Sequence, residues 1–525
     1  MCGRCPHRLL ATLVLVLLAG TAAAQTGFSQ VRAQPGMHIA GSVPLQLRET
    51  HGGEAVTAAA GVEVRWAPEP TSVRMTNSRL GALEAGTRLV SFDLGWDESW
   101  RGPDRPSWVA APDNWDAVWV FVKFRVDGGA WRHATLAASG HSVPAGAVVS
   151  VPGDRMGAFV YRSHSGYGAF AANGVGLAWD VVADGVSVGA RVEVQPFAIE
   201  MVFVPEGSFW LGAGGASTGE FRAGGTRHSP FVVNGQSSIT LGNAAGQLMW
   251  TTSTYSGSPS GSTDASFPTG FDAFYVMKYQ VTQGQYVNFL NTLTQAQADA
   301  RKHTGSDRRY AISGSSVGSY ATSLPFVAMN YASWADGAAF ADWAGLRPMS
   351  ELEFEKAARG PLTPVANEYA WGSTSVTQAT GLANAGTITE TPTPATANAA
   401  YGNASGVRGP VRVGSFAAPG RSRRDAGAGY YGALELSANL YERHVTVGNA
   451  EGRAFAGTHG DGSLDAGGNA NVASWPGALA VGAGFRGGGW SFGDDNMRVS
   501  YRSDAALTSA NRHYLNGWRG ARSAP

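Results

Sequence analysis

The stretch LPFVAMNYASWADGAAFADWAGLRPMSELEFEKAARG, residues 324–360, decides the fold because it contains two helix beginnings. Ser333 stands three residues before Asp336, and Ser350 stands three residues before Glu353. A hydroxyl at the N-cap and an acceptor three residues later satisfy backbone N–H groups that the first turn of a helix leaves unpaired. The spacing therefore predicts one helix after each serine.

The same signal occurs once more upstream, where Thr282 stands three residues before Gln285 and predicts a third helix. This helix places four apolar side chains on one face, and the helix after Ser350 places three on one face. We expect these faces to pack in a core, and Gly360 is placed to end the last helix in a left-handed conformation. The apolar residues are Tyr286, Phe289, Leu290 and Leu293, then Phe354, Ala357 and Ala358.

The first part of the chain is strand-like instead. AVWVFVKFRV (117–126) alternates, DGG (127–129) is a turn signal, and WRHATL (131–136) is predicted as the returning strand of a hairpin. Further short apolar runs separated by Gly, Pro and Asp favour a β-sandwich-like domain over residues 25–198. The runs are GVEVRW (61–66), TRLVSFDL (87–94) and ARVEVQPF (190–197).

A second domain is predicted over residues 199–525. It opens with MVFVPEGSFWLGAG (201–214), read as a strand and a turn. A Gly/Ser-rich stretch at about 212–268 follows, and we expect it to be an inserted surface loop. Helices and strands in separate segments make the fold class α+β.

The first 24 residues are typical of a secretory signal. Arg4 and Arg8 precede the apolar run LLATLVLVLLAG (9–20), and small residues lead to Ala24, after which we expect cleavage. An uncleaved anchor is the alternative, but the run of about 12 residues is short against the roughly 20 that span a bilayer. We therefore expect an exported protein, periplasmic, at the cell surface or secreted, with no transmembrane segment after cleavage.

Composition excludes several classes of function. Both cysteines, Cys2 and Cys5, lie in the predicted signal, so the mature chain would have no thiol chemistry and no disulfide. Lysine and arginine together number 39, and so do aspartate and glutamate, with no basic run to follow a phosphate backbone. Nucleic acid is therefore not an expected partner.

Eight phrases follow one another along the second domain. They are MVFVPEGSFWLGAG, YQVTQGQYVNFLNTL (279–293), the stretch 324–360, YAWGS (369–373), VGSF (413–416), YYGALELSANLYER (430–443), FRGGGW (485–490) and GWRGAR (517–522). Each is weak alone, but in this order they resemble the sulfatase-modifying factor or formylglycine-generating enzyme family. The resemblance implies a variant of the C-type lectin fold with a large groove over residues 199–525.

The founding enzymes of that family oxidise a sulfatase cysteine to formylglycine with oxygen and copper. The resemblance places their two copper-binding cysteines at Phe492 and at approximately Met497. Cu(I) is a soft ion that needs thiolates, so we expect neither copper nor catalytic residues of this type here. A related branch uses iron held by histidines, but the histidines of this chain lack helical i, i+4 spacing.

The resemblance also implies a structural calcium site. In SANLYE (437–442), Asn439 and Glu442 match the family's side-chain oxygens, Leu440 would offer a carbonyl, and Asn384 matches a second position more loosely. The alternative is that Asn439 caps a turn and Glu442 is a paired core acid. The sequence leaves both open.

The tail 491–522 carries varied polar and aromatic residues typical of a recognition surface. Part of it, MRVSYR (497–502), is strand-like, and Arg498, Tyr501 and Arg502 are expected in a buried polar network beneath the final strand. The predicted ligand-binding residues are Trp490, Asp494, Asp495, Asn496, His513 and Tyr514.

Three functions are consistent with these patterns. The first is an exported family member without oxidase activity that binds a peptide or glycan in the C-terminal groove. The second is an enzyme of thiol-independent chemistry in the same groove. The third is a surface or structural protein whose β-rich domain binds a protein partner.

Overall fold

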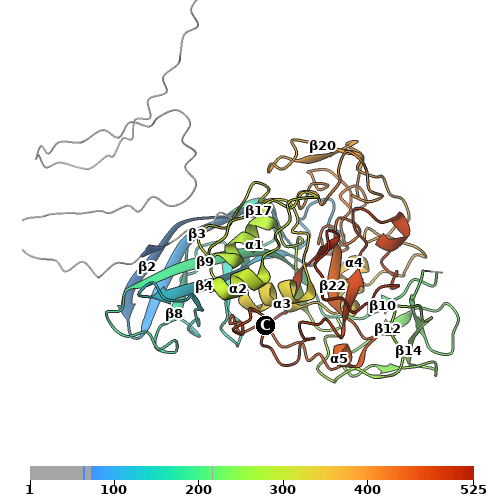
Figure 1. Cartoon of the computed structure of the whole chain (residues 1–525), viewed down its shortest axis with the longest axis horizontal. Coiled ribbons are helices and arrows are strands. Elements are labelled where there is room, and N and C mark those ends of the chain that lie inside the picture. Colours follow the sequence, from blue (N-terminus) through green and yellow to red (C-terminus); the bar gives the residue numbers. More distant parts are fainter. Residues whose placement is uncertain (1–62, 65–71, 216) are drawn as a thin grey trace, which may run out of the picture. The chain divides into compact units, whose positions relative to one another are not determined.

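The computed structural model describes residues 63–64, 72–215 and 217–525, which all fall in one compact unit (Figure 1). The predicted signal peptide and its cleavage site lie outside the described residues. The fold is mixed, with many strands and a few short helices. Among the described residues no helix is both long enough and apolar enough to cross a bilayer.

The largest sheet within the described residues has nine strands, and we call it the central sheet. Its order is β19–β25–β16–β9–β4–β7–β6, with β1 beside β9 and β5 beside β4. Only β1 pairs in parallel, among the pairings described for this sheet. The strands are β1 (Glu63–Val64), β4 (Asp116–Val126), β5 (Arg132–His133), β6 (Ala147–Ser150), β7 (Ala158–Arg162), β9 (Val192–Val204), β16 (Phe274–Met277), β19 (Arg347–Pro348) and β25 (Gly520–Ser523).

The longest pairing in this sheet joins β4 to β9, from Asp116 opposite Val202 to Val126 opposite Val192. The predicted hairpin is confirmed, because β5 pairs antiparallel with β4 and sets His133 opposite Lys123. The boundary predicted between residues 198 and 199 lies inside β9. On one side β9 pairs with β4 and on the other with β16, so the sheet is continuous there.

A second sheet lies over one face of β4, β7 and β9. It consists of β2 (Arg74–Glu84), β3 (Thr87–Arg101) and β8 (Gly166–Asp180), in the order β2–β3–β8. Apolar side chains from both sheets form one core cluster, which includes Val90, Phe92 and Leu94 of β3 and Val118, Val120 and Val122 of β4. Figure 1 shows these strands together, in blue to green.

The other face of the central sheet packs against helices. Trp343 at the end of α3 lies edge-on to Phe121, with ring centroids 5.0 Å apart, and 4.9 Å from Phe197. The described helices are α1 (Gln283–Leu290), α2 (Gln295–Arg301), α3 (Trp334–Trp343), α4 (Glu351–Arg359) and α5 (Ala450–Arg453).

The predicted helix beginnings are confirmed. Thr282, Ser333 and Ser350 are the N-caps of α1, α3 and α4, each with a complete capping box. The same device at Thr294 begins α2, a helix that the sequence analysis did not predict. Gly360 ends α4 with the expected positive φ, 70°, but its ψ of −153° lies outside the left-handed helical conformation.

The Gly/Ser-rich stretch is not the surface loop that we expected. It contains β11 (Phe221–Ala223), β13 (Thr240–Leu241), β14 (Leu248–Trp250) and β15 (Gly261–Ser262) in a four-stranded sheet, and β12 (Phe231–Val233), which pairs with β10 (Phe209–Leu211). The physical reason is that a few apolar residues in this polar stretch are buried. They are Phe221, Leu241, Leu248 and Trp250.

The C-terminal third is mostly loop around short strands. These are β20 (Gly381–Ala383) with β21 (Thr391–Thr393), and β22 (Tyr441–Val445) between β23 (Ala483–Arg486) and β24 (Asn516–Gly517). The pair β17 (Ile312–Ser313) and β18 (Ala321–Thr322) precedes them.

The prediction of a strand over 497–502 was wrong. The chain there forms a 3-10 turn, η1 (Asp494–Met497), followed by another turn in which the Tyr501 N–H donates to the Arg498 carbonyl at 3.0 Å. Two other backbone N–H groups of this stretch donate to carbonyls in distant loops. The Val499 N–H donates to the Glu368 carbonyl at 3.0 Å, and the Arg502 N–H donates to the Thr218 carbonyl at 2.8 Å. The alternation of apolar and polar residues in 497–502 suggested a strand, but no neighbouring strand pairs with this stretch among the described residues.

Candidate functional site

Trp490 forms the base of an aromatic surface built from separate parts of the chain. Its side chain is buried, and its indole N–H donates to the Tyr514 carbonyl at 3.2 Å. The two rings have centroids 5.6 Å apart, and the His513 ring lies 4.1 Å from that of Tyr514. Three of the predicted ligand-binding residues, Trp490, His513 and Tyr514, are therefore brought together.

The other half of this surface was not predicted and comes from the segments after α2 and before α3. Tyr331 lies 6.4 Å from Tyr514 and stacks on His303 at 4.0 Å, ring centroid to centroid. The guanidinium of Arg308 lies 5.6 Å from the Tyr514 ring and 6.0 Å from the Trp490 ring. We call His303, Arg308, Tyr331, Trp490, His513 and Tyr514 the aromatic surface.

The backbone of this surface is strained. Arg308, Arg309 and Tyr331 have φ of 50°, 64° and 58°, in the left-handed region that side chains other than glycine rarely adopt. Such a conformation costs on the order of 1–3 kcal/mol and persists where neighbours over-determine it. Here the Asn330 amide donates to the Arg308 carbonyl at 2.9 Å, and the Tyr331 N–H donates to the His513 carbonyl at 3.1 Å. Strain held in this way is typical of functional sites.

The charges of the aromatic surface are nearly balanced. Burial lowers the pKa of both His303 and His513, which favours neutral imidazoles at pH 7. Burial and a hydrogen bond to Asp307 raise the pKa of Tyr331 to about 12. The exposed cation is Arg308, whose Nε lies 3.8 Å from the neighbouring Asp307 carboxylate. The surface therefore offers ring faces, hydroxyls and one guanidinium.

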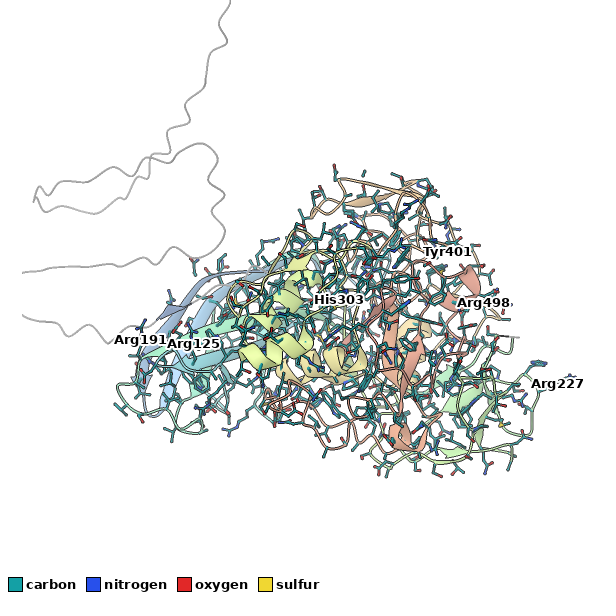
Figure 2. The ribbon with its side chains drawn as sticks, in the orientation of Figure 1. Arg125, Arg191, Arg227, His303, Tyr401 and Arg498 are labelled. Atoms are coloured by element: carbon teal, nitrogen blue, oxygen red, sulfur yellow. The ribbon has the colours of Figure 1, made fainter. Side chains whose placement is uncertain are left out.

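The other predicted ligand-binding residues lie on η1 and have different neighbours. Asp494 is exposed and accepts from the Tyr369 hydroxyl at 3.1 Å, and Asp495 pairs with Arg498. Asn496 is half-buried beside the hydroxyls of Tyr441 and Tyr501. His303 and Arg498, both labelled in Figure 2, thus belong to different clusters of the described residues.

A buried network lies beneath the tail, and of the three residues expected in it only Arg502 is a fully buried member. Arg502 is fully buried and pairs with Glu351 of α4 at 2.7 Å, and Arg486 pairs with Glu351 and Glu355 at 2.9 and 2.6 Å. Arg498 and Tyr501 are only half-buried. The acids that complete the network were not predicted, because on sequence alone they belong to a helix that could equally have faced solvent.

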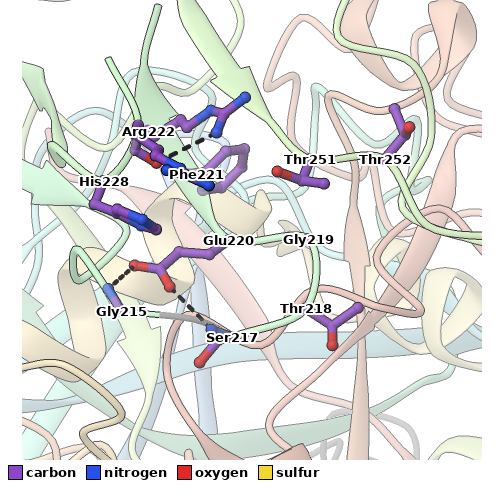
Figure 3. Close-up of a pocket in the computed structure, with 11 residues that line it drawn as sticks. Gly215, Ser217, Thr218, Gly219, Glu220, Phe221, Arg222, His228, Thr251 and Thr252 are labelled. Atoms are coloured by element: carbon purple, nitrogen blue, oxygen red, sulfur yellow. Dashed lines mark hydrogen bonds between the residues drawn. The ribbon is translucent and has the colours of Figure 1, made fainter.

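A cavity of about 300 Å³ lies in the Gly/Ser-rich segment (Figure 3). Its acid, Glu220, accepts from the backbone N–H groups of Gly215 and Ser217 at 3.0 and 3.2 Å. Arg222 and Arg227 also line it, and none of the predicted ligand-binding residues does. The three backbone donors around Glu220, including Ala213 at 2.5 Å, hold the loop closed.

A family comparison covers most of the chain. Residues 190–524 match the model of the sulfatase-modifying factor enzyme 1-like domain. The chain belongs to this family. No curated protein matches the sequence. The match begins inside the strand-like region, just before β9, so the central sheet contains strands from both outside and inside the matched segment.

Within this family member, apolar packing surrounds the two positions where the resemblance places copper-binding cysteines. Phe492 packs against Tyr441, with ring centroids 5.0 Å apart. Met497 is fully buried in a cluster with Tyr369, Trp371 and Ala438. The thioether is thus packed among rings and methyl groups in the described structure.

The oxygens assigned to calcium already have protein partners. Both carboxylate oxygens of Glu442 accept from Arg519, at 2.7 to 2.9 Å, and one also accepts from the Gln280 amide at 3.0 Å. Asn439 Oδ1 accepts from the Val411 N–H at 2.8 Å. Asn384 lies apart from them in sequence, in the exposed turn between β20 and β21. These contacts favour the paired-acid alternative, and calcium here stays a prediction.

Proposed function

We propose that this protein is an exported recognition member of the sulfatase-modifying factor family, which binds a peptide or glycan on the aromatic surface and does not form formylglycine. The observation that carries the proposal is the assembly of Trp490, Tyr514, Tyr331 and Arg308 from three separate segments. Tyr331 and Tyr514 are half-buried, and half-buried rings beside an exposed guanidinium are the groups that recognition surfaces use.

The composition supports the second half of the proposal. The chain has two cysteines, both among its first five residues, and the apolar packing at Phe492 and Met497 leaves no thiolate for Cu(I). A C-type lectin variant is the fold that we propose for residues 199–525, since the mixture of short strands, few helices and long loops suits it. Export rests on the charged, apolar and small-residue order of the first 24 residues.

A binding screen tests recognition. The purified protein is exposed to glycan and peptide arrays, and the best ligand is titrated against single variants. We expect Tyr514→Ala and Arg308→Ala to weaken binding at least tenfold, because each removes a large contact from the centre of the surface. Arg74→Ala serves as the matched control, since Arg74 is an exposed arginine on β2.

Two further variants separate the clusters. Asp494→Ala and Asp495→Ala report whether the η1 acids belong to the same site, as the sequence predicted. The free energy of unfolding should stay within about 0.5 kcal/mol for the exposed positions Arg308, Asp494 and Asp495. Tyr514 is half-buried against Trp490, so the loss of binding in Tyr514→Ala is compared at matched folded fraction. Full binding by both Tyr514→Ala and Arg308→Ala would contradict the proposal.

The absence of oxidase activity has its own assay. The protein is incubated with copper, oxygen and a cysteine-containing sulfatase peptide, and the peptide is examined by mass spectrometry. We expect no aldehyde above the enzyme-free control. Aldehyde formation would instead favour thiol-independent catalysis in this family member.

A further inference from the structure

Lys123 is a buried amine without a carboxylate partner among the described ion pairs. It lies on β4, on the face that packs against Trp343, and is 2% exposed. Its Nζ donates to the Gly462 carbonyl at 2.9 Å and lies 3.0 Å from Nδ1 of His133. Both neighbours are neutral groups, which do not stabilise an ammonium as a carboxylate would.

The tautomer of His133 follows from its other contact. Its Nε2 lies 2.5 Å from the Met156 carbonyl, which can only accept, so Nε2 carries the proton and Nδ1 is the acceptor for Lys123. Gly462 allows the close approach on the other side. Its φ is 82°, and a Cβ there would lie 2.3 Å from His133 Nδ1. The amine is thus held by two precise contacts.

A cavity of about 400 Å³ lies beside this amine, within the range of small-molecule sites. Lys123, His133, Trp131 and Trp343 line it. Its rim consists of exposed residues, namely Arg132, Thr294, Asp461 and Ser463. Solvent and small solutes therefore have a way in.

The environment also changes the charge state of Lys123. Burial lowers its pKa to about 7, against the opposing influence of Asp342 and Asp461, so a large fraction is neutral amine at pH 7. Lys278 is the contrast within the same sheet. It is equally buried but pairs with Glu200 at 3.0 Å and Asp116 at 3.7 Å, and its pKa is raised.

We propose that Lys123 is a reactive amine that forms an imine with a small aldehyde or ketone bound in this cavity. The Nζ lone pair forms a bond to the carbonyl carbon as the C=O π bond breaks, and the oxygen takes up one of the two Nζ protons. The C–O bond of the carbinolamine then breaks, the hydroxyl leaves as water with the second Nζ proton, and a C=N double bond remains. One water leaves for each imine, and no oxidant or reductant is needed.

Reductive labelling tests this on the wild-type protein. Propionaldehyde and sodium cyanoborohydride convert each imine to a stable propyl amine, which peptide mapping assigns to one of four lysines: Lys123, Lys278, Lys302 and Lys356. At pH 7 we expect Lys123 to be labelled at least tenfold faster than Lys302. Lys302 is the less buried amine, and the Asp299 hydrogen bond raises its pKa.

Lys356 is the matched buried control. Burial lowers its pKa to about 8, but it donates to the Gly270 and Phe271 carbonyls and lines none of the cavities described above. Labelling of Lys123 less than tenfold faster than Lys302, or no faster than Lys356, would overturn the proposal. Lys123→Met, checked for folding by circular dichroism, should remove the fast label and leave that of Lys302 unchanged.

Discussion

At the scale of single residues, part of the protein interior consists of a buried network of ion pairs in which glutamates and arginines alternate. Glu351 accepts from Arg502 and Arg486, and Glu355 accepts from Arg486 and Arg359 at 2.6 and 3.1 Å. All five side chains are almost fully buried. Such pairs need not add stability over an apolar core, but removal of one member leaves its partners charged and unpaired.

We therefore expect Glu351→Gln to reduce the free energy of unfolding by about 3–5 kcal/mol. Urea denaturation followed by fluorescence measures it. The matched control is Asp97→Asn, whose partner Arg74 lies 2.9 Å away but is exposed, and this change should cost about 0.2–1 kcal/mol. Equal effects of the two variants would show that burial of the network is energetically unimportant.

His444 is a second residue whose burial has a measurable consequence. Its Nδ1 donates to the Glu442 carbonyl at 2.9 Å, while Nε2 is buried with no partner among the described residues. Burial and the nearby Arg486 lower the pKa of His444 from 6.5 to about 3. The imidazole therefore stays neutral in the fold at pH values where the unfolded chain is protonated.

The sign of the pH effect follows. The unfolded state binds the proton first, so the stability contribution of neutral His444 is complete above pH 6.5 and is lost as the pH falls toward 3. Between pH 6.5 and about 3, we expect His444 to lower the free energy of unfolding by about 1.4 kcal/mol for each unit by which the pH falls. Urea denaturation from pH 7 to pH 4 measures the slope. His444→Leu should flatten it, and an unchanged slope in that variant would contradict the assignment.

At the scale of elements, α3 illustrates how packing overrides helix propensity. Gly337 lies in the middle of α3, where alanine would normally be better by about 1 kcal/mol. A Cβ at this position would lie 2.1 Å from Cδ1 of the Trp518 ring, which is itself buried. The glycine is needed for the contact between α3 and the chain just before β25.

Gly337→Ala should consequently lower the melting temperature by several degrees, because overpacking costs typically 1–3 kcal/mol. Differential scanning calorimetry measures the shift. Gly493→Ala is the control: its φ is −67° and a Cβ there meets nothing within 4 Å, so the melting temperature should not change. A rise in Gly337→Ala would mean that Trp518 moves aside without cost.

The elements show what the sequence could predict. Capping boxes are local, so Thr282, Ser333 and Ser350 were sufficient to locate three helices. The alternation in 117–126 likewise located β4. Failures occurred where distant partners decide the structure: the strands of the Gly/Ser-rich segment depend on a few buried side chains, and the stretch 497–502 donates its backbone N–H groups to remote loops.

At the scale of the whole molecule, the aromatic surface could be only half predicted for the same reason. His513 and Tyr514 lie in the tail 491–522, whose composition indicated recognition, and Trp490 directly precedes it. Their partners His303, Arg308 and Tyr331 come from loops around α2 and α3, and no local pattern connects them to that tail. Lys123 was missed because a lysine within an alternating strand reads as a solvent-facing residue.

Chelation tests the calcium prediction on the intact protein. The Glu442 carboxylate is held by Arg519, and Gln280 Nε2 donates to both Glu442 and the Leu440 carbonyl at 3.0 Å. With Asn439 Oδ1, four oxygens from three proposed ligand residues are therefore already bonded. A hard cation would have to displace Arg519 to bind Glu442.

We expect EDTA, compared with EDTA plus excess calcium, to leave the melting temperature unchanged. A ligand that binds only the folded state at 100 times its Kd adds about 2.7 kcal/mol, so a real site would raise the melting temperature with added calcium. Such a rise, lost in Asn439→Ala, would support the calcium interpretation and require Arg519 to move.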